Sequence, residues 1–475
     1  MKRTLYILTA LLMATSVLYS CKKIADYKNL STAVVPVVSP ISEVGCLTPI
    51  GTATSVALNG TMLAGKTYNV CGNVLVGAKD TLVIQPGVTI NFKGNYGVGV
   101  HGTLISLGTK EAPIYFTHLG TVKTDQIGNN AGVDSAYIGK WTGIIGAADC
   151  NKIILKWTHI EFAGAATSGD IKVLSGSPYP LYFQNPNGAV VMEDSWIYGS
   201  VDDAVRTVGG KLEFFRNTFE KCGYTGGEAL NAKAGTIGDF AYNLCIGIAT
   251  NGPKNSNISA APGVPGSNIR MYNNTIVNCG YRRIAAGRGG SLNFEQGAAG
   301  NAYNNIIVNC KFGLRIVQYP IADTANIRYG YNYSYADSAS VANQIYPSQA
   351  ISTAITSAMP TDVPLPSTFL PSGWMPGNTY TATPAIIGAN NPQFINGPVP
   401  LPAGAKLRDI VTVGSYNFNL KLTSPYVGKG YTSFMPYGLE KGTVPVDAKY
   451  GVTEYTLPGK DIGAYQTNGT GNQHF

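Results

Sequence analysis

Seven polar residues in the middle of the chain have the types and spacing to form one chemical site. We call this set the polar strip, and it consists of Arg206, Asn231, Lys233, Asn251, Asn293, Glu295 and Arg315. Arginine or lysine can neutralise a carboxylate, and a lysine whose pKa is lowered by burial can accept a proton as a general base. We therefore predict Lys233, Glu295 and Arg315 as catalytic residues, and Arg206, Asn231, Asn251 and Asn293 as substrate-binding residues.

A recurring phrase places these residues in successive repeats. Each copy opens with an asparagine, at Asn217, Asn243, Asn274 or Asn305, and continues with an apolar strand and a cysteine. The steps between the asparagines are 26, 31 and 31 residues, and looser copies are centred on Thr158, Asp194 and Asn332. A repeat of this length, made only of short strands and turns, is typical of a parallel β-solenoid in which each coil is buried by its neighbours.

The strand that follows each copy predicts which side chains share a face. Alignment of the repeats places a set of apolar residues inward, namely Val205, Leu230, Ile248, Leu292 and Leu314. Because side chains alternate along a strand, two outward columns follow. The first is Arg206, Asn231, Ala249, Asn293 and Arg315, and the second is Val208, Lys233, Asn251, Glu295 and Val317. Adjacent strands are about 4.8 Å apart, so Lys233 and Glu295 are expected roughly 10 Å apart. An ordinary solvated sheet face is the alternative interpretation.

The composition indicates a large all-β protein. Of the 475 residues, 44% are apolar, 13% are charged and 57 are glycine, which argues against a helical bundle, a coiled coil and simple disorder. The net charge of +8 is spread along the chain rather than clustered, so we do not expect nucleic acid as a partner. The four histidines lie far apart and no CxxC pair occurs, so no metal site is expected.

The repeat also predicts structural roles for residues that might otherwise suggest chemistry. Asparagines 217, 274 and 305 are expected to form a ladder in which each amide bonds the backbone of the next coil. Cysteines 222, 279 and 310 share one column and are expected to be free, buried thiols in the core.

The N-terminus is similar to that of an exported lipoprotein. Lys2 and Arg3 precede an apolar run, and Leu-Tyr-Ser-Cys ends at Cys21, which resembles the lipobox of bacterial lipoproteins. We predict a signal peptide at 1–20, lipidation of Cys21, and a polar tether at 21–45. The expected location is the outer membrane, facing the periplasm or the cell surface, with the lipid as the membrane contact.

The strand patterns resemble those of the right-handed parallel β-helix repeat family, whose pectate-lyase-like members wind three short sheets around an apolar column. Residues 81–117 open with Leu-x-Ile-x-Pro-Gly-Val-x-Ile-x-Phe, and Asn-Asn-x-Ile-Val-x-Cys occurs at 273–279. The resemblance covers roughly residues 56–337 and includes a closing stretch similar to that of Bacteroidetes-type surface proteins. We predict an all-β fold: a right-handed parallel β-helix at 46–340, with an irregular C-terminal segment at 341–475 packed on it.

The resemblance implies an acidic polysaccharide that is cleaved by β-elimination. Arg206, Arg315 or Lys233 would neutralise the uronate, and Lys233 would serve as the base. A glycoside hydrolase would instead need two carboxylates about 5 to 9.5 Å apart, for which Asp203 and Glu228 on neighbouring coils are candidates. No cofactor is expected. Binding of Ca²⁺ stays an open alternative, although no motif indicates it.

A non-catalytic role is the alternative function. The chain would then be a glycan-binding, adhesive or structural surface lipoprotein, and its many tyrosines, Tyr179 and Tyr182 among them, would stack on sugar rings. In either class the expected partner is a polysaccharide or a surface glycan. Whether the protein is an enzyme stays open from sequence alone.

Lipidation at Cys21 can be tested by substitution. Cys21→Ala removes the thiol that would carry the lipid, so the variant should be released from membranes or should stay unprocessed. Membrane fractionation and metabolic lipid labelling check this. Unchanged fractionation with the label still attached would contradict the prediction.

Overall fold

The computed structural model describes most of the central part of the chain. The described residues are 39–47, 58–123, 133–166, 171, 179–257, 263–285, 288–318, 326–338, 348–351, 362–364, 388, 391–397, 416–438 and 455–474. The predicted signal peptide, Cys21, most of the predicted tether and much of the segment after residue 338 lie outside these ranges. Within them, no helix is both long and apolar enough to cross a membrane.

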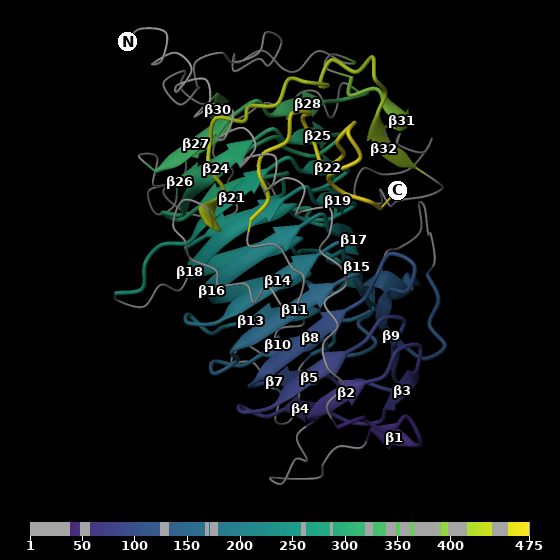
Figure 1. Cartoon of the computed structure of the whole chain (residues 1–475). Coiled ribbons are helices and arrows are strands. Elements are labelled where there is room, and N and C mark those ends of the chain that lie inside the picture. Colours follow the sequence, from purple (N-terminus) through teal and green to yellow (C-terminus); the bar gives the residue numbers. More distant parts are fainter. Residues whose placement is uncertain are drawn as a thin grey trace, which may run out of the picture. The chain divides into compact units, whose positions relative to one another are not determined.

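The strands stack into three parallel ladders, which confirms the predicted parallel β-helix (Figure 1). Ladder one contains β4 (Val74–Val76), β7 (Val98–Val100), β10 (Ile144–Gly146), β13 (Leu181–Phe183), the first half of β16 (Val205–Phe215), the first half of β18 (Leu230–Ala241), β20 (Pro253–Ser256), β23 (Asn293–Glu295), β26 (Arg315–Gln318) and β29 (Ser348–Ile351). Strand β30 (Asp362–Pro364) pairs antiparallel with β29.

The other two ladders form the remaining sides of the coils. Ladder two contains β2 (Gly60–Met62), β5 (Thr81–Ile84), β8 (Thr103–Leu107), β11 (Lys152–Lys156), β14 (Ala189–Glu193), the second halves of β16 and β18, β21 (Asn268–Tyr272), β24 (Ala299–Tyr303) and β27 (Ile327–Gly330). Ladder three contains β1 (Cys46–Leu47), β3 (Thr67–Val70), β6 (Thr89–Phe92), β9 (Ile114–His118), β12 (Thr158–Glu161), β15 (Trp196–Ser200), β17 (Thr218–Cys222), β19 (Leu244–Ile246), β22 (Thr275–Val277), β25 (Ile306–Val308) and β28 (Tyr333–Tyr335). Outside the ladders lie a short 3-10 helix, η3 (Ser135–Tyr137), and the antiparallel pair β31 (Phe394–Asn396) and β32 (Asn417–Leu420).

Glycines let two long strands turn from ladder one into ladder two. In β16 the register with β18 shifts between Val208 and Gly210, and both Gly209 and Gly210 have positive φ angles, 84° and 89°. Gly235 of β18 has a φ of 79° beside them. Residues with side chains rarely adopt this conformation, so glycine is the residue that permits the corner.

Apolar side chains fill the space between the ladders. Phe214, Phe219 and Phe240 come from strands of ladders two and three, are fully buried, and have ring centroids 5.6 to 6.5 Å apart. Nearer the N-terminal end of the β-helix, the Phe92 ring stacks on the Trp141 ring with centroids 4.0 Å apart. The period-two alternation of the strands therefore places their apolar positions in one continuous core.

The predicted asparagine ladder is confirmed at the turn into ladder three. Asn274 Oδ1 accepts from the backbone N–H of Asn243 at 2.9 Å, and Asn274 Nδ2 donates to the carbonyl of Phe240 at 3.0 Å. The same pattern continues to Asn305 and Asn332. One alignment was wrong by a residue: Ser195, not Asp194, occupies the ladder position, where its N–H donates to Asn217 Oδ1 at 3.0 Å.

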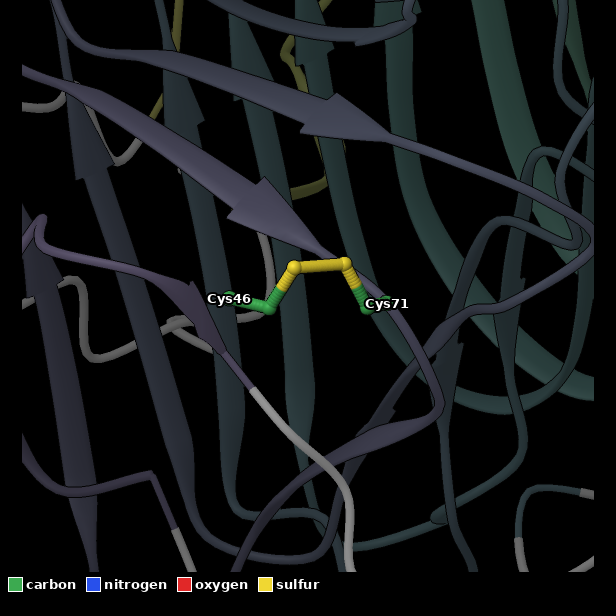
Figure 2. Close-up of a disulfide and its surroundings, with 2 residues drawn as sticks. All are labelled: Cys46 and Cys71. Carbon is green, nitrogen blue, oxygen red and sulfur yellow. A yellow bond between two sulfur atoms is a disulfide. The ribbon is translucent and has the colours of Figure 1, made fainter.

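The cysteines divide into one disulfide and a group of buried thiols. Cys222, Cys279 and Cys310 are free and buried, as predicted, together with Cys150 and Cys245. Their burial in the core raises the pKa of Cys222 to about 12, so this thiol is unreactive. A bond between Cys46 and Cys71, which the sequence did not indicate, joins β1 to the residue after β3 (Figure 2).

Residues 455–474, which we call the C-terminal strap, lie against the outside of the helix. Asn472 Nδ2 donates to the carbonyl of Asn217 at 2.9 Å, and the backbone N–H of Ala464 donates to Thr275 Oγ1 at 3.0 Å. At one end, the His474 ring stacks on Trp196 with centroids 5.4 Å apart. The strap therefore satisfies polar groups on several consecutive coils.

The asparagine ladder should contribute measurably to stability. Asn274→Ala removes an acceptor and a donor from fully buried backbone groups of neighbouring coils, so it should lower the free energy of unfolding by roughly 3 kcal/mol. Asn151→Ala is the control, because this asparagine is exposed and should change stability by less than about 0.5 kcal/mol. Urea denaturation measures both values, and equal stability of the two variants would refute a stabilising ladder.

Candidate functional site

The register of ladder one brings most of the polar strip onto consecutive strands. Tyr182, Arg206, Asn231, Lys254, Asn293 and Arg315 occupy one outward column. The predicted column had Ala249 where Lys254 stands, and this alignment was wrong. The strand begins at Pro253 rather than at Ile248, because Ala249 to Gly252 belong to the preceding turn.

The second column also differs by one member from the prediction. In the structure, Val208 pairs with Lys233. Further along the ladder, Glu295 lies between Ser256 and Val317 and pairs with both. Ser256 therefore takes the place predicted for Asn251, which lies in the turn before β20. Lys233 and Glu295 remain two strands apart, which corresponds to roughly 10 Å.

The polar strip is buried rather than solvated. The exposed fractions of Asn231, Lys233, Glu295 and Arg315 are 1%, 7%, 5% and 2%, while the side chain of Arg206 is 24% exposed. The alternative interpretation, an ordinary solvated sheet face, does not agree with this burial. Charged side chains are rarely buried to this extent unless they are paired, so their partners define the site.

Two acidic residues from the turns before β16 and β18 pair with the cations of the first column. Asp203 Oδ2 is 2.8 Å from the guanidinium of Arg206, and Glu228 Oε1 is 2.8 Å from Lys254 Nζ. The backbone N–H of Glu228 donates to Asp203 Oδ1 at 3.0 Å, which joins the two turns. The sequence placed Asp203 and Glu228 at equivalent positions of neighbouring coils, and the structure confirms that they are neighbours.

Carboxylates also fix the orientation of the three asparagines. Asn231 Nδ2 donates to Asp203 Oδ2 at 2.9 Å, Asn251 Nδ2 to Glu228 Oε1 at 3.2 Å, and Asn293 Nδ2 to Glu295 Oε1 at 3.1 Å. Wherever such a carboxyl group is ionised it only accepts hydrogen bonds, so the amide beside it turns its NH₂ group toward it. The three amide oxygens then point elsewhere, and they are buried without a hydrogen-bond partner among the described residues.

Lys233 is the cation of the strip with no hydrogen bond or ion pair to any described residue. Burial lowers the pKa of Lys233 to about 8, and the nearby positive charges of Lys254 and Arg206 act in the same direction. Burial also raises the pKa of Glu228 to about 7, although Lys254 opposes this shift. The site therefore holds a base and an acid that titrate near neutral pH, which is the range suited to proton transfer.

Basic side chains surround the Arg315 end of the strip. Arg315 lies over the Phe312 ring at 4.4 Å, and its Nη1 donates to the carbonyl of Gly289 at 3.3 Å. Lys311 Nζ donates to the carbonyl of Arg283 at 2.8 Å. Burial lowers the pKa of Lys311 to about 8, and Arg315 and Arg283 add to the effect. This end of the strip therefore favours negatively charged ligands.

Arg282, which precedes Arg283 in the chain, has a structural role. Its guanidinium is buried and donates to the carbonyls of Cys222, Gly223 and Gly247 at 2.7 to 3.0 Å. It also lies over the Tyr137 ring at 4.5 Å. Its charge therefore binds turns together and does not add to the edge of the strip.

Two tyrosines lie at the opposite end of the strip. The rings of Tyr179 and Tyr182 are nearly parallel with centroids 5.8 Å apart, and the Arg206 guanidinium lies 4.4 Å from the Tyr179 centroid. Other tyrosines pack against the C-terminal part of the chain, as Tyr331 does on Tyr431 at 5.0 Å. Of these rings, the pair beside Arg206 is the one adjoining the strip.

The described residues contain no group of three or more His, Cys, Asp or Glu side chains that could hold a metal ion. Comparison of the chain with models of protein families, with curated proteins and with solved structures gave no match.

The unpaired lysine should reduce stability. Lys233→Met removes an amine whose pKa in the folded state is about 8 against an ordinary value of 10.5, so the variant should be more stable by up to roughly 3 kcal/mol at pH 7. Below pH 8 the wild-type protein carries this full cost. Its stability should then rise between about pH 8 and pH 10.5, where only the unfolded state keeps the proton, and Lys233→Met should lack this rise.

Lys254→Met is the matched control for this measurement. It removes a buried lysine of the same ladder that is ion-paired, so it should lower stability by about 3 to 5 kcal/mol by leaving Glu228 without its cation. Urea unfolding as a function of pH measures both variants. Equal destabilisation by the two substitutions would show that Lys233 is paired in the folded protein.

Proposed function

We propose that this protein is an exported, lipid-anchored β-helix protein that binds or processes carbohydrate, with an acidic polysaccharide as its ligand. The parallel β-helix is compatible with this function, and its stacked coils provide a rigid face along which a polymer can lie. The resemblance to pectate-lyase-like repeats supports the same class of ligand.

One observation carries the proposal: in a buried setting, the strip contains a lysine and three amide oxygens that have no partner among the residues the structure describes. Polar groups inside proteins are almost always hydrogen-bonded, and the exceptions tend to be functional. Lys233 offers a cation or a base, while Asn231, Asn251 and Asn293 offer acceptors for hydroxyl groups. A polyhydroxylated ligand that bears carboxylates satisfies both kinds of group.

The arrangement is suited to β-elimination on a uronate. Arg206, on the strand next to that of Lys233, would neutralise the carboxylate, which makes the adjacent C5 proton more acidic. Neutral Lys233 would take that proton, the C5–H electron pair would form the C4–C5 double bond, and the C4–O bond would break with its electrons leaving on oxygen. That oxygen would then take a proton from solvent, so the reaction needs no oxidant or second substrate.

Non-catalytic glycan binding is the second candidate, and the carboxylates favour it. Asp203, Glu228 and Glu295 are all hydrogen-bonded to asparagine amides, and the first two are also ion-paired. These bonds hold the carboxylates in place and leave none of them free as the nucleophile of a glycoside hydrolase. Without turnover, the same groups would still position the ligand.

The proposed location outside the cytoplasm has separate support. The disulfide between Cys46 and Cys71 closes the first coil, and such bonds persist in oxidising compartments. Together with the lipobox-like sequence ending at Cys21, this supports an outer-membrane lipoprotein with a periplasmic or cell-surface face.

Incubation of the purified full-length protein with a panel of polysaccharides tests the function. A lyase would generate the ultraviolet absorbance of an unsaturated uronate. Lys233→Ala should lower that activity roughly 100-fold or more, and Arg315→Ala should weaken binding about tenfold. Lys152→Ala, on ladder two, is the control and should behave like the wild type.

The outcomes separate the candidates. Binding without turnover would identify a glycan-binding protein. Binding or activity that survives Lys233→Ala and Arg315→Ala, but is abolished by substitutions on another face, would contradict the assignment of the strip.

A further inference from the structure

We propose that the end of the C-terminal strap is a pH-sensitive latch, which is closed on ladder three at neutral pH and opens in acid. The latch consists of residues 472–474, and the group that responds to pH is the imidazole ring of His474. Asn472 Oδ1 accepts from the backbone N–H of His474 at 2.8 Å, so the two residues move as one unit. The inference concerns a different region from the polar strip and does not depend on the carbohydrate function.

Aromatic rings enclose the His474 side chain on the outer face of ladder three. Its ring stacks on the Trp196 ring with centroids 5.4 Å apart, and Trp157 makes an edge contact at the same centroid distance. His159 is the register partner of Trp196, and its ring lies 6.1 Å from that of His474. His474 is only 8% exposed. Such surroundings favour a neutral imidazole over a charged one.

The hydrogen bonds of the two histidines also favour the neutral form. His474 Nδ1 lies 2.9 Å from Thr218 Oγ1, whereas its Nε2 is buried and has no hydrogen-bond partner among the described residues. His159 Nδ1 is buried in the same way. A protonated imidazole carries an N–H on both nitrogens, so charging either ring would leave a buried donor unpaired.

The basic groups near the latch oppose protonation of His474. Lys123 Nζ lies 4.6 Å from the centroid of the Trp196 ring on which His474 stacks, and Lys110 is a second nearby cation. Burial lowers the pKa of His474, and both of these charges act in the same direction. Glu161 offsets part of the charge of Lys123, because its Oε1 is 2.8 Å from Lys123 Nζ.

Asp194 is the acid that favours a charged His474, through its carboxylate and its backbone. Its two carboxylate oxygens, however, accept from the guanidinium of Arg216 at 2.7 and 3.0 Å, so its charge is already paired. Burial therefore prevails and lowers the pKa of His474 to about 4 and that of His159 to about 3. Tyr115, whose ring lies 4.8 Å from that of His159, stays neutral because burial raises the pKa of its hydroxyl.

The direction of the pH effect follows from the closed and open states. In the open latch the His474 ring is in solvent, where a histidine titrates near pH 6.5. Below that pH the open form takes up a proton that the closed form excludes, so the equilibrium shifts toward opening. With a pKa of about 4 in the closed form, closure should be roughly 30-fold weaker at pH 5 than at pH 7.5. Opening also uncovers His159, and a second proton then adds to the effect.

Acid should open the latch without detaching the rest of the strap. The backbone N–H of Gly463 donates to the carbonyl of Asn304 at 2.8 Å, and that of Ala464 donates to Thr275 Oγ1 at 3.0 Å. Neither bond contains a group that titrates between pH 5 and pH 7.5. They hold the strap on its coils while the latch moves.

Hydrogen exchange of the full-length protein at pH 7.5 and pH 5 tests the latch. After correction for the intrinsic exchange rates, the amides of Asn472 and His474 should be protected roughly 30-fold less at pH 5. The amide of Val190, in the core of ladder two, should stay protected at both pH values. An NMR titration of the four histidine rings provides a second measurement, in which His474 should titrate well below pH 6.5.

Three variants identify the titrating group. His474→Phe keeps a ring between the tryptophans that cannot be protonated, so protection of the latch should change by less than about threefold between the two pH values. His474→Ala removes the ring and should leave the latch unprotected at both. His101→Gln is the control, because this histidine pairs with Asp149 away from the strap, and it should keep the wild-type pH dependence.

Several outcomes would overturn the latch. Equal protection of the wild-type amides at pH 7.5 and pH 5 would show that closure does not respond to acid. A wild-type pH dependence in His474→Phe would assign the response to another group. Loss of protection at Val190 together with the latch would show general acid unfolding. If the Phe variant does not fold, titration of His474 near pH 6.5 in the wild type would still refute the proposal.

Discussion

The stacking of asparagine amides at the turn into ladder three sets the geometry on which the rest of the structure depends. Each amide bonds the backbone of adjacent coils, and the residue before it takes a left-handed conformation in coil after coil, with φ angles of 60°, 58°, 51° and 58° at Arg216, Tyr242, Asn273 and Asn304. This repeated corner fixes where every following strand begins. Without it, a shift of one residue would exchange inward and outward side chains and dissolve the strip.

The strip itself depends on the buried acids of the turns before β16 and β18. Asp203 and Glu228 neutralise Arg206 and Lys254, and they simultaneously orient the amides of Asn231 and Asn251. Burying ion pairs seldom adds net stability, so their presence is better explained by the arrangement that they impose. The unpaired amine of Lys233 is held in place at a cost to stability, which is typical of functional sites.

The repeat made the fold predictable from the sequence, because Asn217, Asn274 and Asn305 stand at a spacing that only a stack of coils explains. The site was less predictable. Lys254 was missed because its strand opens with Pro253 and follows a turn whose length differs from the other coils, so alignment on the asparagines slipped there. The burial of the strip and the Cys46–Cys71 bond depend on contacts between separate segments, which no local pattern records.

The C-terminal strap imposes an order on assembly. Its bonds join residues far apart in the chain: Thr218 to His474 spans 256 positions and Asn217 to Asn472 spans 255. Such contacts cannot form until the coils that present Asn217, Thr275 and Asn304 have already stacked, because closing so long a loop is favourable only onto a finished surface. The strap can therefore bind only after several coils have reached their native register. A coil that misaligned during folding would not present the hydrogen-bonding groups to which the strap binds.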